Sequence, residues 1–452
     1  MTDYMNELRD RIGSIVPAGI IGRVVSTKGA TIAVTGFPAP IGSVAQIDCK
    51  DRAPILAEVI DFRDNNTILY SYSDLTGISR GSTIRLVQTV PTIPVGDELL
   101  GRVVNAFGET IDSGCRPVLP QRMRYDQKPP DPCSRPPIDS ILSTGIRAID
   151  MMLTCGRGQR LGIFSGSGVG KSVTLGMMTR YTNADVIVIA LIGERGREVS
   201  EFIQNELGEE GRRKCVVVVS TSNEPALMRV RAAQGAMSIA EYFRDSGKNV
   251  LFLMDSLTRL AMAQRELGLA AGEPATARGY TPSVFSMLPR FVERAGKSDR
   301  GSITAFFTVL VEGDDRQDPI GDAVRGLLDG HIWLSRKLST AGYYPAIDIV
   351  ESISRSMQNI CSEEHLRHAA EARRMLGIYR DLEDMIDIGA WRPGVNSETD
   401  LAVAMKPKLD AFLQQARFEE APFDDTAEAF AQLLNSAKTE DVSKNDFDNT
   451  IR

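Results

Sequence analysis

A glycine- and serine-rich segment carries the strongest chemical signal in the sequence. Residues 165–172 read Ser-Gly-Ser-Gly-Val-Gly-Lys-Ser, after an apolar run that predicts a strand and at the start of a predicted helix. Such a loop turns backbone N–H groups toward a β-phosphate, and the helix N-terminus adds the positive end of its dipole. Lys171 would reach the β- and γ-phosphates, and the Ser172 hydroxyl would bind Mg²⁺. The predicted phosphate-binding residues are Ser165 (where the general pattern has Gly), Gly166, Ser167, Gly168, Val169, Gly170, Lys171 and Ser172.

Two carboxylates follow other apolar runs that predict buried strands. Asp255 ends the run over residues 249–255, where a carboxylate would support the Mg²⁺ of a triphosphate site. Glu194 follows the run over residues 186–192, which places it at the carboxyl end of a strand beside the nucleotide crevice. A carboxylate there could activate water as a general base. Taken alone, the segment around Glu194 is better interpreted as an exposed charged loop.

The overall composition is that of an ordinary globular protein. The 452 residues are 42% hydrophobic and 25% charged, with 52 Lys and Arg against 59 Asp and Glu, for a net charge of −7. This excludes global disorder and disfavours a dominant phosphate-attracting surface for nucleic acid. No apolar run approaches the roughly 18 residues that a membrane-spanning helix needs. The acidic N-terminus has no apolar core, so we expect no signal peptide.

Cysteine and histidine usage favours a cytosolic protein without a metal centre of its own. The six cysteines form no C-x-x-C pair and are expected to be reduced thiols. His365 and His368 could share a helix face, but no second pair of ligands accompanies them. We expect them to belong to a solvated helix surface rather than to a metal site.

Hydrophobic patterning predicts a multidomain chain. Short strands punctuated by glycine over residues 19–90 predict a small β-barrel, with a hairpin around Asp64-Asn65-Asn66. Residues 91–362 predict a central α/β nucleotide-binding (RecA-like P-loop) domain with a mainly parallel sheet, because near-continuous apolar runs alternate with helical segments. Residues 363–435 predict an α-helical domain, and residues 436–452 a polar, frayed tail. The expected central strands cover residues 160–164, 186–192, 215–220, 250–254 and 303–311.

The two ends of the chain raise more specific expectations. Helices are expected over residues 363–388, 398–417 and 424–435, with Pro407 breaking the second of them. Within residues 1–18, Met5, Leu8, Ile12 and Ile15 form one stripe of a short helix. That stripe could pack on its own domain or dock on another protein, and the sequence does not separate the two.

Several longer segments resemble a known family. The phosphate loop, Gly-Glu-Arg-Gly-Arg-Glu at 193–198, Asp-Ser-Leu-Thr-Arg at 255–259 and Ser-Ile-Ser-Arg at 352–355 resemble the hexameric ATPases related to rotary ATP synthase. Within them, residues 257–270 and 309–315 resemble the flagellar branch of the type III protein export ATPases, as do residues 144–150 and 153–160. The resemblance covers roughly residues 20–395.

The resemblance implies further site residues. Arg195 and Arg259 match positions near the γ-phosphate, and Tyr344 matches an aromatic that packs on adenine, with a core tyrosine as the alternative. Arg355 matches an arginine finger that enters the neighbouring subunit's site. Because Glu194 and Arg355 are on one chain, the resemblance implies a homo-hexameric ring with head-to-tail contacts. Residues 381–387 are acidic but differ from the stalk-facing run of the catalytic ATP synthase subunit, so contact with another stalk protein or with cargo is expected.

The implied function is Mg·ATP hydrolysis that energises flagellar protein export. The implied partners are export regulator and stalk proteins, chaperone–substrate complexes and an export gate at the inner membrane, for a cytoplasmic protein at that membrane. Three alternatives stay open: the ATPase of a virulence injectisome, a hexameric RNA translocase and a non-hydrolysing subunit of a rotary motor. The charge of −7 and the lack of basic and aromatic residues interleaved in the barrel disfavour the RNA translocase, and Glu194 disfavours the non-hydrolysing subunit.

Overall fold

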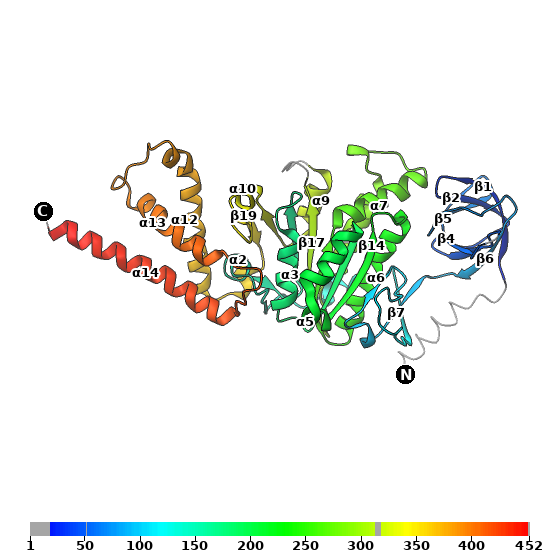
Figure 1. The fold of residues 1–452 in the computed structure, drawn as a ribbon, viewed down its shortest axis with the longest axis horizontal. Helices are drawn as coiled ribbons and strands as arrows, with labels where there is room; N and C mark the ends of the chain where they lie inside the picture. Colours follow the sequence, from blue (N-terminus) through cyan, green and yellow to red (C-terminus); the bar gives the residue numbers. More distant parts are fainter. Residues whose placement is uncertain (1–18, 51, 312–317, 451–452) are drawn as a thin grey trace.

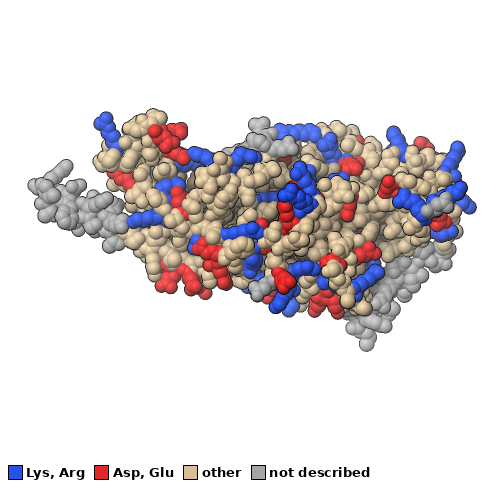
Figure 2. Space-filling view, viewed as in Figure 1, with Lys and Arg blue, Asp and Glu red and all other residues tan. Residues whose placement is uncertain are grey.

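A computed structural model describes residues 19–50, 52–311 and 318–450. Three parts follow one another along the long axis of the molecule: a β-barrel, a central α/β domain and a group of helices (Figure 1). The helix predicted for residues 1–18 lies outside the described residues. Lys and Arg are interspersed with Asp and Glu over the face shown in Figure 2. None of the helices in the described ranges is long and apolar enough to cross a membrane.

The barrel predicted at the N-terminal end is present. Its six strands close in the order β1-β2-β5-β4-β3-β6. The predicted hairpin joins β4 to β5 through Asp64 and Asn65, both with positive φ, as a two-residue turn requires. Alternate side chains such as Ile32, Val34 and Leu69 fill the interior. The strands are β1 (Ile21–Lys28), β2 (Thr31–Thr35), β3 (Val44–Ile47), β4 (Ile55–Arg63), β5 (Asn66–Ser71) and β6 (Thr83–Gln88).

The central domain is built on a nine-stranded sheet. Its order is β19-β18-β12-β17-β15-β13-β14-β8, with β16 paired to β17. All five predicted strands are present and mutually parallel where they pair. The edge strand β19 runs antiparallel to β18. The strands are β8 (Val103–Val104), β12 (Arg160–Ser165), β13 (Val186–Glu194), β14 (Cys215–Thr221), β15 (Asn249–Asp255), β16 (Gly296–Lys297), β17 (Ser302–Leu310), β18 (Gly330–Leu334) and β19 (Ile347–Ser354).

Helices bury both faces of this sheet, which explains the continuous apolar runs. Along β13, Val186, Val188 and Ala190 contribute to one hydrophobic core, together with helices α6 (Ala226–Asp245) and α7 (Leu257–Ala270). The alternate residues Ile187 and Ile189 contribute to a second core with α2 (Arg147–Met152) and α3 (Lys171–Tyr181).

Shorter elements connect these parts. They are β7 (Thr92–Val95), β9 (Gln121–Arg124), β10 (Ile141–Leu142), β11 (Cys155–Gly156), α4 (Gly196–Glu201), the π-helix η3 (Phe202–Leu207), α5 (Gly208–Arg213), α8 (Pro282–Val292), α9 (Pro319–Leu327), α10 (Arg336–Thr340), α11 (Met357–Ile360) and the 3₁₀ turns η1 (Asp97–Leu99), η2 (Pro132–Ser134) and η4 (Ala277–Gly279).

The C-terminal part consists of helices α12 (Glu363–Asp387), α13 (Ser397–Leu413) and α14 (Phe423–Thr450). Two expectations for it were wrong. Helix α13 continues through Pro407, because Met405 and Leu409 are buried on either side of the exposed proline and hold the helix in place. Helix α14 continues to Thr450 where a frayed tail was expected, since no glycine or proline ends it before that residue.

The two histidines of α12 lie in a packed contact rather than on the solvated surface expected for them. His365 Nε2 is 3.0 Å from the Met151 carbonyl oxygen of α2, and His368 is buried against Phe430 of α14. Among the described residues, no group of three or more His, Cys, Asp or Glu side chains could hold a metal ion. The pair therefore joins the helices of the C-terminal part to the central domain.

Replacing Pro407 by Ala should stabilise the protein, because alanine restores the missing N–H donor and removes the ring from a helix interior. We expect the free energy of unfolding to rise by about 1–3 kcal/mol, measured by denaturant unfolding. Ala411→Gln, at another exposed position of α13, is the control and should change it by less than about 0.5 kcal/mol. A destabilised Pro407→Ala variant would contradict the packing explanation.

Candidate functional site

The predicted phosphate loop joins β12 to α3 at the carboxyl edge of the sheet. Ser165 is buried at the end of β12, and Lys171 begins α3. Gly168 and Gly170 have φ values of 79° and 95°, a region that side chains with a Cβ rarely adopt. The exposed Ser172 follows in the first turn of the helix. The loop therefore has the strand–turn–helix context that the motif requires.

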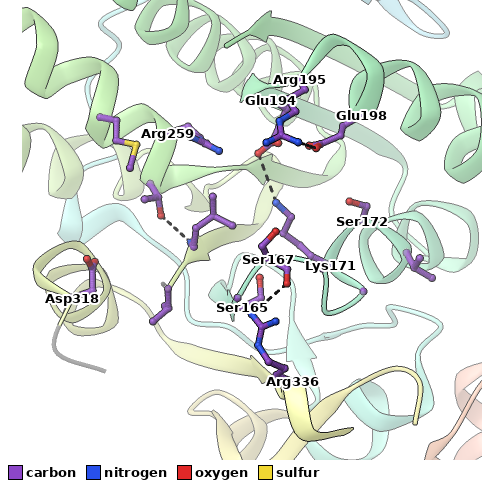
Figure 3. Close-up of a pocket in the computed structure, with 18 of the residues that line it drawn as sticks. Ser165, Ser167, Lys171, Ser172, Glu194, Arg195, Glu198, Arg259, Asp318 and Arg336 are labelled. Atoms are coloured by element: carbon purple, nitrogen blue, oxygen red, sulfur yellow. Dashed lines mark hydrogen bonds and ion pairs between the residues drawn. The ribbon is translucent and has the colours of Figure 1, made fainter. Parts of the chain in front are cut away.

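Three charged side chains meet beside this loop. Lys171 Nζ lies 2.5 Å from Asp255 Oδ1. The same atom lies 3.7 Å from Glu194 Oε1 (Figure 3). Asp255 ends β15 and Glu194 ends β13, and these neighbouring strands are parallel, so both carboxylates emerge at the same edge. The Thr308 hydroxyl on β17 donates a hydrogen bond of 2.9 Å to Asp255 Oδ1. The structure thus brings together the three residues that the sequence predicted from separate motifs.

The environment of Glu194 changes its proton affinity. Burial and the nearby Asp255 charge raise the pKa of Glu194 to about 7, while the charge of Lys171 acts in the opposite direction. Burial disfavours the charged form of Lys171 too, yet the two carboxylates raise its pKa and keep it a cation. A carboxylate with a pKa near neutrality can accept a proton from water and release it again at cellular pH.

Lys171 and Glu194 line a cleft of about 900 Å³ that is rich in cations. Lys171 is joined there by Arg195, Arg259 and Arg336. Within the described chain, three buried polar atoms on the cleft walls have no hydrogen-bond partner, namely Ser165 Oγ, Glu194 Oε1 and Arg259 Nε. The Ser165 hydroxyl and the Arg259 Nε–H are donors that fit the oxygens of a bound polyphosphate, whereas Glu194 Oε1 is an acceptor and fits a water molecule instead.

The two arginines predicted near the γ-phosphate differ in how firmly they are held. The stem of Arg259 lies against Gly193, and Ser256 caps the helix that carries it by accepting a hydrogen bond of 3.2 Å from the Arg259 N–H. Arg195 is 81% exposed and is paired with Glu198 at 3.6 Å (Figure 3). Arg259 is therefore preorganised toward the cleft, whereas Arg195 is free to reorient.

Tyr344 lies beside the phosphate loop but does not line the cleft. A Cβ added at Gly170 would be 3.5 Å from the Tyr344 ring, and that side chain is 45% exposed. Its hydroxyl contacts Ser339, the oxygens being 3.1 Å apart. This half-exposed ring is not the core tyrosine of the alternative interpretation.

Arg355 lies at the opposite end of the sheet from the phosphate loop. Its N–H donates to the Asp329 carbonyl at 3.0 Å, and the Asp329 N–H donates to the Arg160 carbonyl at 2.8 Å. Arg160 begins the strand that Ser165 ends, so the length of β12, roughly 17 Å, separates Arg355 from its own loop. The Arg355 side chain is exposed rather than buried against its own chain.

Several side chains at the site were not predicted. Arg336 follows β18 and approaches the Ser167 carbonyl at 3.4 Å, and Thr258 accepts a hydrogen bond of 2.9 Å from the Leu310 N–H. Thr308 is a buried polar residue inside a largely apolar strand. A threonine within that apolar run is the one signal in the sequence that could have indicated its role. The residues that reasoning from sequence missed are Glu198, Thr258, Thr308, Asp318 and Arg336.

A phosphate loop on a mainly parallel sheet, with a largely buried lysine and two carboxylates at its edge, defines a P-loop nucleotide-binding ATPase. Comparison with known proteins agrees with this class. The model for the ATP synthase alpha/beta family nucleotide-binding domain matches residues 145–354, and that for the beta-barrel domain of the same family matches residues 20–87. The T3SS EscN ATPase C-terminal domain matches residues 361–432.

Individual relatives match nearly the whole chain. The flagellum-specific ATP synthase of Bacillus subtilis is 48% identical over 92% of this chain and 95% of its own length. The SPI-2 type 3 secretion system ATPase of Salmonella typhimurium is 48% identical over 83% of this chain and 87% of its own. The assembled ATPase EscN of enteropathogenic E. coli superposes with a TM-score of 0.86 at 44% identity, over 91% of this chain and 99% of that one. The chain belongs to the ATP synthase alpha/beta family, in its branch of type III export ATPases.

The raised pKa of Glu194 makes a prediction about pH. A general base at Glu194 works only when ionised, so kcat/KM for Mg·ATP should rise with pH through a midpoint of about 7 and then level off. Glu198→Ala should move the midpoint to lower pH, because Glu198 contributes to the raised pKa of Glu194. Glu201→Gln, which removes an exposed carboxylate paired with Arg197, is the control and should leave the midpoint unchanged. A profile with no step between about pH 6 and pH 8 would exclude Glu194 as the titrating base.

Proposed function

We propose that this ATPase energises protein export at the base of a bacterial flagellum, with its hydrolytic site in the cleft beside the phosphate loop. The observation that carries the hydrolytic role is the buried carboxylate of Glu194, 3.7 Å from Lys171 and with a pKa of about 7. The flagellar assignment rests on the curated flagellum-specific relatives, which are 42–48% identical over 90% or more of this chain.

In the proposed reaction, Glu194 accepts a proton from a water molecule as the water oxygen bonds to the γ-phosphorus. The bond from that phosphorus to the β,γ-bridging oxygen breaks, and the electron pair leaves with ADP. Lys171 and Arg259 offset the charge on the phosphoryl oxygens, and the backbone N–H groups of residues 166–170 hold the β-phosphate. Arg195, exposed and loosely paired, reorients toward the γ-phosphate when nucleotide is bound.

The donor set also fits Mg²⁺. Ser172 offers an exposed hydroxyl at the start of α3, and Asp255 offers a carboxylate whose position the Thr308 hydroxyl fixes. One hydroxyl and one carboxylate are the few protein ligands that Mg²⁺ takes when triphosphate oxygens and water complete its coordination. Ser172 and Asp255 would therefore hold the ion, which supplies charge neutralisation to the phosphates when bound. Tyr344, exposed beside Gly170, would pack on the adenine ring.

Arg355 completes the site of a neighbouring subunit in this proposal. The separation of about 17 Å along β12 prevents it from reaching its own phosphate loop, while its exposure leaves it available to a second copy. Head-to-tail contacts close into a ring when the rotation between neighbouring subunits permits closure, and we propose a homo-hexamer of this kind. The relative EscN has been described as assembled, and in complex with its central stalk EscO.

The proposed partners follow from the same assignment. They are a regulator protein, a stalk protein, chaperone–substrate complexes and an export gate, with the ATPase in the cytoplasm at the inner membrane. An injectisome ATPase is the second candidate, supported by the 48% identity to the SPI-2 ATPase. Its chemistry would be the same and its cargo different. An RNA translocase would instead show turnover that RNA stimulates.

Mixing two inactive variants tests the shared site. Lys171→Ala disables the chain's own loop but leaves Arg355, whereas Arg355→Ala leaves an intact loop without its finger. In randomly mixed rings about a quarter of the interfaces combine an intact loop with an intact finger, so activity should return to at least several per cent of the parent's. Each variant alone should have less than about 1% of parental kcat, since fingers contribute about 10³–10⁵ in related phosphoryl transfer.

Diluting the mixture to a concentration where the parent is monomeric should abolish the recovered activity, which serves as its control. If Arg355→Ala alone retains parental activity at every protein concentration, each chain works alone and the finger assignment fails.

A deletion strain separates the flagellar from the injectisome assignment. Loss of the gene should abolish motility and flagellin export, and the parental chain supplied in trans should restore both. Glu194→Gln should not restore export when the proton-motive force is limiting. Full motility in the deletion strain, with loss of effector secretion instead, would establish the injectisome candidate. Normal export by Glu194→Gln under that limitation would disconnect hydrolysis from export.

A further inference from the structure

A buried acidic residue outside the cleft joins three segments that are far apart in the sequence. Glu206, in the π-helix η3, is only 8% exposed. Its Oε1 lies 3.0 Å from Arg417, in the segment between α13 and α14, and its Oε2 lies 3.9 Å from Arg180, near the end of α3. Burying a carboxylate this deeply costs free energy unless cations pair with it. Here the two cations come from different parts of the molecule.

The contact between Glu206 and α3 is close. A Cβ added at Gly176 would be 2.6 Å from Glu206 Oε2, so only glycine at that position lets the carboxylate approach the helix. Oε2 has no hydrogen-bond partner within the described chain. Gly176 lies five residues after Lys171 in the same helix. Any displacement of α3 relative to η3 therefore changes the contact between Gly176 and Glu206.

On its N-terminal side, Glu206 is connected through the chain to Glu194, the proposed base. Glu194 ends β13, Arg195 caps α4, and α4 continues directly into η3 without an intervening loop. The Val199 N–H donates to the Arg195 carbonyl at 3.0 Å, which connects the cap to the helix. A π-helical turn adds one residue to a helical path and frequently marks a functional position. Here it rotates Glu206 into the contact between α3 and the C-terminal segment.

The C-terminal segment is attached at the same place. Arg180 Nη2 donates to the Arg417 carbonyl at 2.8 Å, and Arg417 donates to the Asn205 carbonyl next to Glu206. Both guanidinium groups lie 4.8 Å from the ring centre of Phe418, which is 67% exposed. A cavity of about 550 Å³ adjoins these side chains and gives them room to rearrange.

We propose that Glu206 is a positioning residue that couples the C-terminal helices to catalysis. Arg417 holds the Glu206 carboxylate, which connects α3, the helix that begins with Lys171, to α4 and η3, the helices that follow Glu194. A shift of the C-terminal helices would then change the distance between Lys171 and Glu194. A protein that binds the C-terminal helices would control catalysis through this connection. The inference rests on the proposed roles of Lys171 and Glu194.

Two kinetic variants and one conservative variant test the proposal in the full-length, assembled chain. Glu206→Gln and Arg417→Gln should each lower kcat for Mg·ATP roughly tenfold while KM changes by less than about twofold, because the binding cleft itself is untouched. Arg417→Lys keeps the cation and should retain at least half of kcat. Glu209→Gln, which alters a neighbouring exposed glutamate on the rim of the same cavity, is the control and should behave as the parent.

A second measurement separates coupling from a loss of stability. Hydrogen exchange of residues 414–422 should slow when Mg·AMP-PNP is added to the parent and to Glu209→Gln. The same addition should leave exchange unchanged in Arg417→Gln, although the analogue binds that variant with parental affinity. If Glu206→Gln does not fold, the partly exposed Arg417 still provides the test.

The proposal fails if Arg417→Gln keeps kcat within about twofold of the parent, or if its 414–422 segment responds to the analogue as the parent's does. It fails equally if the parental segment shows no response. A parent without Mg·ATP hydrolysis would refute the catalytic assignment itself, so the two failures are distinguishable.

Discussion

The ion pair between Lys171 and Asp255 is the interaction on which the rest of the site depends. Both groups are largely buried, and either one alone would be an uncompensated charge in a poorly solvated environment. Thr308 fixes the orientation of Asp255, and the charge of Asp255 in turn raises the pKa of Glu194 while that of Lys171 opposes the shift. Burial is the largest cause of the raised pKa of Glu194, and this ion pair, which does not itself take the proton, adjusts that pKa further.

The sheet explains why these groups meet and why sequence could predict it. Strands buried on both faces read as continuous apolar runs, and parallel strands deliver their final residues to one edge, so Glu194 and Asp255 could be placed beside the phosphate loop without coordinates. Arg336 could not be placed beside the phosphate loop in this way, because it follows a strand whose buried and half-buried residues alternate. Pro407 was misjudged since local propensity was outweighed by burial of Met405 and Leu409. The position of Arg355 depends on the antiparallel pairing of β19, which no local pattern reveals.

The two faces of the sheet connect it to different neighbours. The core on the α6 and α7 side includes barrel residues such as Tyr70 and Tyr72, whereas the core on the α3 side includes Met405 and Phe430 of the C-terminal helices. The helix that begins with Lys171 therefore shares its hydrophobic core with the C-terminal part and not with the barrel. Packed side chains thus connect the C-terminal helices to the helix that follows the phosphate loop, while the barrel is joined to the opposite face.

Strand β19 has a consequence for communication around a ring. It begins three residues after Tyr344 and ends one residue before Arg355, so a strand of eight residues, roughly 26 Å long, lies between these two residues. On the proposed roles, two active sites share this single rigid part. Occupation of one site that tilts the strand displaces the arginine in the other, so neighbouring subunits would hydrolyse ATP in succession rather than independently.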